Sequence, residues 1–301
     1  MSESKSILVG VDFSDCSRAA LAQALRLGKA RGCQVHAAHV VDTLVVVALQ
    51  EVLPPEARAI HDQSINEARR AWEQFAAAVP GGGGATFHVE MNNRIAGVLG
   101  LVEKTHAGLL VLGCSGDPET GIGTMTTECI GRSPADVLLV RENHSGPFKR
   151  VVACVDFSQT SRGALDAAAQ IAAADGAQLS VVHVFEAPWT RLYYRLPALD
   201  AADAFEGDYR RALEARLREF VAESGAKVAA ASPTCELFDG GGHRSGIAEY
   251  ARSRKADLVV LGTHGRSNLR DTLLGSTAVK ALQKTTCSVL AVKPRAVAAR
   301  V

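Results

Sequence analysis

Apolar residues along this chain are grouped in short, nearly unbroken runs. Residues 7–11 read ILVGV and residues 151–155 read VVACV. Such runs are typical of parallel strands that are buried on both faces of a sheet. Each run is followed by a longer segment whose apolar residues recur with a helical period, such as Leu21, Ala24 and Leu25. This alternation predicts a parallel sheet that is covered by helices on both faces.

The same pattern occurs twice along the chain. Residues 7–14, ILVGVDFS, return as residues 151–158, VVACVDFS. The stretch from Gly97 to Gly113 matches the stretch from Gly246 to Gly262 in length, and each ends in an apolar run. Several matches in the same order indicate a tandem duplication.

The duplication predicts two domains, residues 1–146 and 147–301, which are joined at the polar stretch 142–147 with its Gly-Pro breaker. Each half has room for five strands and about four helices. Because crossovers between parallel strands are right-handed, the expected fold is α/β, with two tandem, doubly wound, five-stranded parallel-sheet domains. Ligands of such sheets bind outside the carboxyl ends of the strands.

Charge and composition exclude several classes of function. The net charge of +1 gives no electrostatic pull toward nucleic acid or acidic lipid, and no apolar stretch is long enough to span a membrane. Seven scattered cysteines without a Cys-x-x-Cys spacing favour a reducing, cytoplasmic location. Residues 1–146 hold 12 basic and 16 acidic residues and residues 147–301 hold 21 and 16, so the second half is the better candidate for an anionic ligand.

One loop of the second half carries the strongest candidate chemistry. Directly after an apolar run come Gly262 and Gly265, and nine residues later Gly275, Ser276 and Thr277 open a helical pattern. A helix start offers unpaired N–H groups to an anion, and glycines let a ligand approach the backbone closely. With Arg266 and Arg270 in reach, the loop predicts a phosphate site. Three glycines that only make a turn, with Ser276 as a helix cap, are the alternative interpretation. The loop lacks the Gly-Lys-Ser/Thr ending of a P-loop and the Gly-x-Gly-x-x-Gly of a dinucleotide fold.

The spacing Gly-x2-Gly-x9-Gly-Ser-Thr after a Val-Val-Leu run, together with Val-Asp-Phe-Ser after the first run of each half, resembles the universal stress protein family. The resemblance covers residues 5–142 and 149–294. It implies an adenine nucleotide alpha hydrolase-like fold that binds ATP, or AMP after turnover, with Mg²⁺ as an accompanying ion. It also implies pairing through the last strand of each domain, within one chain and in a homodimer. The residues that the resemblance implies for the nucleotide are Asp156, Val184, Gly262, Gly265, Arg266, Gly275, Ser276 and Thr277.

Within this set the resemblance assigns the nucleoside end to Asp156 and the adenine to the backbone of Val184. By itself, a carboxylate at a strand end either accepts hydrogen bonds from ribose hydroxyls or caps the helix that begins after Ser158. The sequence leaves these two roles of Asp156 open.

The first half departs from the pattern. Only six residues separate Gly116 from Gly123, and Asp117 and Glu119 bring negative charge to the loop. Two carboxylates beside a polyphosphate weaken binding unless a metal ion intervenes. A decayed site kept as a packing partner is the default interpretation, and a site retuned for another ligand is the alternative.

No catalytic or metal-binding set follows from the spacing of the residues. His36, His39, Asp42 and Cys33 lie close in sequence but do not share one strand face, so no metal is expected. His264 is either a solvated loop residue, a neighbour of the adenine or a slow general base. The sequence therefore predicts an ATP- or AMP-binding regulator or sensor in stress response. A slow ATP hydrolase and a nucleotide-free interaction scaffold are the alternatives.

Overall fold

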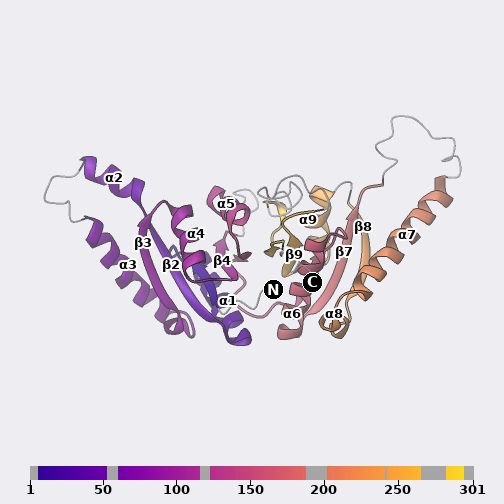
Figure 1. Ribbon diagram of the computed structural model, residues 1–301, viewed down its shortest axis with the longest axis horizontal. Coiled ribbons are helices and arrows are strands. Elements are labelled where there is room, and N and C mark those ends of the chain that lie inside the picture. Colours follow the sequence, from indigo (N-terminus) through magenta and orange to yellow (C-terminus); the bar gives the residue numbers. More distant parts are fainter. Residues whose placement is uncertain are drawn as a thin grey trace, which may run out of the picture. The chain divides into compact units, whose positions relative to one another are not determined.

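The chain divides into two compact units, Met1–Pro147 and Phe148–Val301. The structure is a computed structural model (Figure 1). It describes residues 6–52, 60–115, 123–187, 202–240, 243–265 and 283–294. Each unit is described by itself below.

The first unit is a five-stranded parallel sheet with helices between the strands. Its elements in chain order are β1 (Ser6–Gly10), α1 (Asp15–Arg31), β2 (Gln34–Asp42), α2 (Thr43–Val52), α3 (Ile60–Ala77), a 3₁₀ turn (Gly82–Gly84), β3 (Thr86–Asn92), α4 (Arg94–Lys104), β4 (Leu109–Cys114), α5 (Thr124–Arg132) and β5 (Asp136–Arg141). The strand order is β3-β2-β1-β4-β5, and the neighbouring strands are parallel.

The second unit repeats this plan. Its described elements are β6 (Arg150–Cys154), α6 (Gln159–Asp175), β7 (Gln178–Phe185), α7 (Ala202–Ala222), α8 (Ala226–Ala230), β8 (Thr234–Asp239), α9 (His243–Ser253), β9 (Leu258–Gly262) and β10 (Ser288–Val292). The strand order is β10-β9-β6-β7-β8, again with parallel neighbours. The predicted α/β fold with two tandem five-stranded parallel sheets is confirmed.

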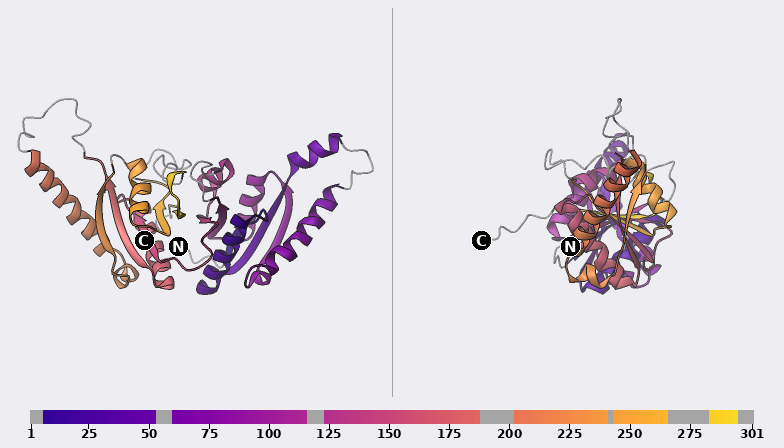
Figure 2. Two further views of the ribbon diagram at one scale, coloured as in Figure 1. Left: turned by 180° about the vertical axis from the view of Figure 1, so that it is seen from behind. Right: turned by 90° about the vertical axis from the view of Figure 1, so that its right-hand side faces the viewer.

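The winding direction of each sheet reverses beside its first strand. In the first unit the chain moves from β1 outward to β3, and then returns to β4 on the other side of β1. Right-handed crossovers therefore place α1 and α3 on one face of the sheet, and α4 and α5 on the other. The contacts of α1 with β1 and β4, and of α4 with α5, agree with this arrangement, which Figures 1 and 2 show from opposite sides. A crevice at the carboxyl ends of β1 and β4 is the expected ligand position.

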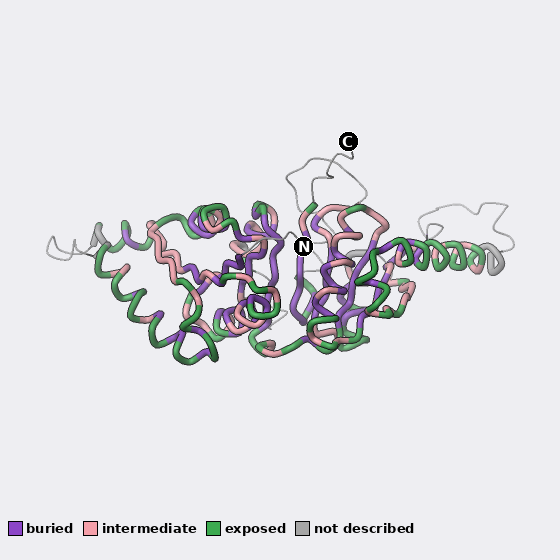
Figure 3. The backbone as a smooth tube through the Cα atoms, turned by 60° about the horizontal axis from the view of Figure 1, so that its bottom comes forward, coloured by how far each residue is buried: buried purple, intermediate pink, exposed green. Residues whose placement is uncertain are grey.

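The local sequence explains where these elements form. All six residues of β5 and all five of β10 are buried, as the apolar runs predict, and Figure 3 shows buried strands with exposed helix faces around them. Ser14 and Ser158 each cap the following helix by accepting a hydrogen bond from a backbone N–H three residues on. Gly32 and Gly176 end these helices with a left-handed φ of 63° each.

Within the described ranges, no helix combines the length and the apolar character that a bilayer span requires.

Candidate functional site

The turn after the first strand of each unit is built in the same way. Phe13 and Phe157 adopt left-handed backbone angles, with φ of 65° and 64°. Few side chains tolerate this conformation, so the surroundings must hold it in place. The ring of Phe157 lies 4.4 Å from that of His183, and the ring of Phe13 lies 4.7 Å from that of His39. This turn directs the preceding aspartate of each unit to the carboxyl end of the sheet.

The two histidines of these turns have a structural role. The Nδ1 atom of His183 lies 2.8 Å from the carbonyl oxygen of Val155, and the Nδ1 atom of His39 lies 2.8 Å from that of Val11. Because a carbonyl oxygen only accepts, Nδ1 of each ring carries a proton and donates. Each ring thus ties the end of the second strand to the end of the first.

Asp156 occupies the turn without capping α6, because Ser158 is the cap. The Oδ1 atom of Asp156 accepts a hydrogen bond from the backbone N–H of Ser158 at 3.0 Å. Its Oδ2 atom lies toward Gly265, where a Cβ would approach it to 2.8 Å. The structure therefore brings together Asp156 and Gly265, two of the residues expected at the nucleotide.

Asp12 repeats this contact in the first unit. Its Oδ1 accepts from the backbone N–H of Ser14 at 3.0 Å. Burial would raise the pKa of the Asp12 carboxyl, but the hydrogen bonds from Ser14 and Ser17 outweigh it and hold the pKa below its ordinary value. Asp12 is therefore an ionised acceptor at neutral pH.

Gly262, the last residue of β9, is required by the packing of this strand on α6. A Cβ at this position would lie 2.8 Å from Cγ2 of Thr160 in α6 and 3.3 Å from the carbonyl oxygen of His264. The matching Gly113 is tighter still, with backbone atoms of Cys16 at 2.3 and 2.4 Å from such a Cβ. The sequence predicted that a glycine here clears space for a ligand. The structure adds that the glycine lets the strand approach the helix.

His264 is more enclosed than a solvated loop residue. The Oγ1 atom of Thr263 donates to the carbonyl oxygen of Val292 at 3.2 Å, so Thr263 accepts from Nδ1 of His264 at 3.0 Å. The Nε2 atom of His264 is then an acceptor, and it is buried with no hydrogen-bond partner among the residues that the structure describes. A buried acceptor of this kind calls for a donor from a ligand or a water molecule.

Val184 lies near the carboxyl end of β7, opposite Phe238 of β8. Its side chain packs against α9, where a Cβ on Gly246 would come within 2.5 Å of it. The remaining four expected site residues, Arg266, Gly275, Ser276 and Thr277, lie outside the described residues.

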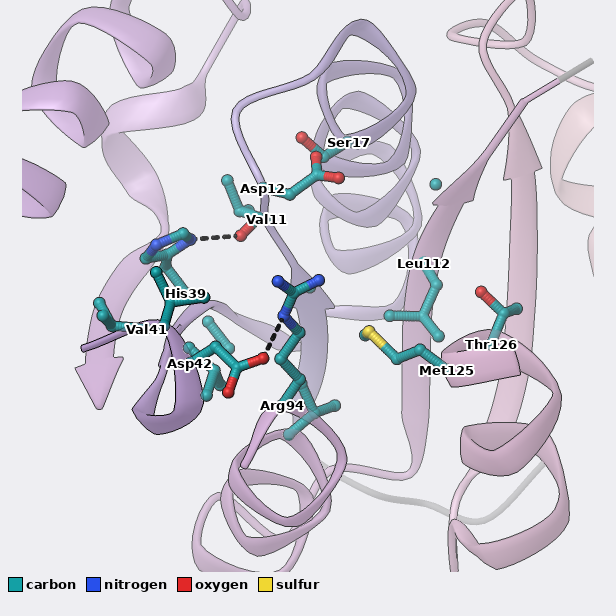
Figure 4. Close-up of a pocket in the computed structure, with 16 residues that line it drawn as sticks. Val11, Asp12, Ser17, His39, Val41, Asp42, Arg94, Leu112, Met125 and Thr126 are labelled. Carbon is teal, nitrogen blue, oxygen red and sulfur yellow. Dashed lines mark hydrogen bonds and ion pairs between the residues drawn. The ribbon is translucent and has the colours of Figure 1, made fainter. Parts of the chain in front are cut away.

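The first unit contains an open cavity of about 450 Å³ at the carboxyl ends of β1, β2 and β4 (Figure 4). This volume is in the range of small-molecule sites. Its walls are mostly apolar and include Val11, Leu112 and Met125. On one side of the cavity, the Nε atom of Arg94 lies 3.0 Å from Oδ2 of Asp42. The cavity lies where ligands of doubly wound sheets bind, so the decayed site and the retuned site both stay as predictions for the first half. Asp117 and Glu119 lie outside the described residues.

Comparison with known proteins agrees with the duplicated fold. The sequence model of the universal stress protein family matches residues 3–141 and again residues 147–293. The chain belongs to the universal stress protein family.

Two relatives of this universal stress protein each match about half of it. Universal stress protein A homolog 1 of Coxiella burnetii is 32% identical over 154 residues, which cover 48% of this chain and 96% of that protein. Universal stress protein YxiE of Bacillus subtilis is 26% identical over 147 residues, which cover 48% of this chain and 99% of that protein. The crystal structure of a universal stress protein from Archaeoglobus fulgidus matches with a TM-score of 0.65 at 18% identity, and covers 96% of this chain and 98% of that one. This last likeness shows the shared fold.

Two side-chain contacts in this universal stress protein could not be predicted from its sequence. The Asp42–Arg94 pair joins the end of β2 to the start of α4, which no local spacing indicates. His36 contacts His88 of β3 rather than any of its neighbours in sequence. Within the described ranges, no group of three histidine, cysteine, aspartate or glutamate residues is arranged to hold a metal ion.

Proposed function

We propose that this universal stress protein binds one adenine nucleotide, ATP or AMP, in its second half and acts as a nucleotide-dependent regulator. The observation that carries the proposal is the loop Gly262-x2-Gly265-x9-Gly275-Ser276-Thr277, which leaves β9 at the position where ligands of doubly wound sheets bind. The helical pattern after Gly275 would offer its first N–H groups to the phosphates.

The described part of the second half fits a nucleoside next to this loop. Asp156 and Gly265 are in contact range, and the buried Nε2 of His264 lacks a described donor. A ribose hydroxyl donates as readily as it accepts, so a carboxylate oxygen and an imidazole nitrogen are suitable partners for it. Arg266 would face the phosphates, where Mg²⁺ is the ion that accompanies ATP in most sites.

Titration calorimetry tests the proposal. Full-length protein is stripped of small molecules under conditions that preserve its circular dichroism, and is then titrated with Mg·ATP and with AMP. We expect one nucleotide per chain. Flat traces for both ligands would contradict nucleotide binding, and two sites per chain would show that the first half also binds.

A second candidate function is slow hydrolysis, and His264 is the observation that favours it. The Nε2 atom of His264 could act as a general base if the ligand leaves it facing a water molecule. Following ATP, ADP and AMP over hours with the same preparation separates the functions. Bound nucleotide without turnover supports the regulator, and several turnovers per chain support the hydrolase.

The duplicated aspartates provide a matched pair of variants. Asp156→Asn should weaken nucleotide binding by roughly tenfold to a hundredfold, because a hydrogen bond to a charged group is worth about 1.5–3 kcal/mol. Asp12→Asn changes the equivalent turn of the first half and should leave the affinity unchanged. Calorimetry of both variants checks this prediction. Equal losses in the two variants would mean that the binding site does not reside in the second half.

The predicted homodimer through terminal strands remains part of the proposal. Sedimentation of the stripped and nucleotide-loaded protein measures it.

A further inference from the structure

Two histidines of the first unit face each other across neighbouring strands. The Nδ1 atom of His36 in β2 lies 3.0 Å from the Nε2 atom of His88 in β3. The ring centroids are 5.2 Å apart, so the rings lie nearly end to end. Because His36 is opposite Thr86 in the strand register, His88 is its diagonal neighbour on the same face of the sheet. This is the geometry of a hydrogen bond between two imidazoles, in which one ring donates and the other accepts.

The pair joins the last strand of the first sheet to the rest of that sheet. β3 is the terminal strand in the order β3-β2-β1-β4-β5, and its residues are at most half-buried. In the second unit, the strand register places Ser180 at the position of His36 and Glu236 at that of His88. Ser180 accepts a hydrogen bond from Thr234 at 3.0 Å, and Glu236 pairs with Arg254. The fold therefore does not require histidines at this place, and a pair of imidazoles, which titrate near neutral pH, stands here in the first unit.

The proton count of the pair determines what acid does to it. When both rings are neutral, the N–H of one facing nitrogen donates a hydrogen bond to the lone pair of the other. A first added proton goes to an outer nitrogen of one ring and leaves the central hydrogen bond intact, with the charged ring as donor. A second added proton makes both facing nitrogens donors, so that no hydrogen bond is possible and two like charges face each other at 3.0 Å. The pair titrates as a unit, and its second protonation separates the rings.

Burial and the charged groups around the pair disfavour protonation of the two rings in the folded chain. Lys104 of α4 raises the positive potential at His88, and Glu90 of β3, which pairs with Lys104 at 3.2 Å, offsets it in part. Burial lowers the pKa of both His36 and His88, and the charge of His88 lowers that of His36 further. The unfolded chain therefore binds more protons than the folded chain below the ordinary histidine pKa of about 6.5. Stability is fully present above that pH and decreases as the pH falls through the lowered values.

We propose that His36 and His88 form an acid-sensitive latch that holds β3 to β2 at neutral pH and releases it in mild acid. β3 leads into Asn93, whose side chain caps α4, and then into Arg94, which contacts Asp42 at the wall of the first-half cavity. Release of β3 therefore alters this cavity. The latch belongs to the first half and does not depend on nucleotide binding in the second.

A tryptophan on the opposite face of β3 reports the state of the latch. Trp72 of α3 stacks on Phe87 of β3, with ring centroids 4.7 Å apart and an angle of 1° between the planes. The chain has two tryptophans, so Trp189→Phe leaves Trp72 as the single fluorophore. In this background, emission is followed from about pH 7.5 to about pH 5, a range that spans the ordinary pKa of histidine. We expect a reversible change in Trp72 emission in acid, and its loss in His88→Gln and in His36→Gln.

Two controls distinguish the latch from general acid effects. Glutamine keeps a donor and an acceptor but does not titrate, so circular dichroism at pH 7.5 should be unchanged in both variants. His144→Gln, in the loop after β5, should retain the acid-induced change. Titration of the histidine C–H signals by nuclear magnetic resonance gives an independent readout, in which removal of one partner should raise the pKa of the other. The same acid transition in His88→Gln as in the parent would overturn the proposal, as would unchanged titration of His36 when His88 is removed.

Discussion

Replacing Gly275 by valine is expected to abolish nucleotide binding, with a loss of affinity of at least about a hundredfold. In a loop that cradles phosphate, the N–H groups must approach the anion, and a branched side chain at the third glycine keeps them away. Each hydrogen bond to a charged group is worth about 1.5–3 kcal/mol, so the loss of two corresponds to a hundredfold or more. Calorimetric titration of the stripped variant with Mg·ATP measures the effect.

The duplication supplies the control for this variant. Gly123 is the third glycine of the first-half loop and directly precedes α5. Its φ is −56°, which other residues adopt, and no atom of the residues that the structure describes lies within 4 Å of the position that a Cβ would take. Gly123→Val should therefore fold normally and bind nucleotide like the parent chain. If Gly275→Val kept the affinity of the parent, the assignment of the third glycine to the phosphates would be wrong.

The fold could be predicted because its determinants are local and repeated. A run such as Leu258–Leu261 is buried throughout, which only a strand covered on both faces accommodates. The helix predicted to begin after Ser158 does begin at Gln159, since a serine there satisfies a backbone N–H. Once strands and helices alternate, handedness leaves few topologies. Because the chain is duplicated, each predicted strand and helix is supported by two independent stretches of sequence.

Contacts between side chains on different strands could not be predicted. The sequence groups His36 with its neighbours Cys33, His39 and Asp42, but its partner in the structure is His88. That contact depends on the register between β2 and β3, which places His36 opposite Thr86. A one-residue slip would turn these side chains to opposite faces. An apolar pattern indicates which face of a strand is buried, but not which residue lies beside it.

The glycines of the site show a second kind of information that the sequence pattern does not give, namely which role each glycine has. The spacing of Gly262 and Gly265 predicted a ligand, and the structure gives each glycine a contact within the protein as well. Gly262 packs on Thr160, and Gly265 lies against Asp156. Both roles require the absence of a side chain, so the sequence pattern does not separate them. Substitutions that differ in how closely the added methyl approaches its neighbours can separate the contribution of each glycine to stability from its contribution to ligand binding.

Replacing Gly113 by alanine is expected to destabilise the first half by roughly 3 kcal/mol, the upper end of the range for overpacking. The added methyl would lie 2.3 Å from the carbonyl carbon of Cys16, which is backbone at the start of α1 and cannot turn aside like a side chain. Gly262→Ala should cost less, because its nearest described neighbour is a methyl group of Thr160 at 2.8 Å.

Gly100→Ala is the opposite control. It lies in the interior of α4, and no described atom lies within 4 Å of the added methyl, so it should stabilise by about 0.5–1 kcal/mol. Urea unfolding in the Trp189→Phe background, followed by Trp72, measures the first half for Gly113 and Gly100. Circular dichroism follows the whole chain for Gly262. If Gly113→Ala were as stable as the parent, the close approach of β4 to α1 would be wrong.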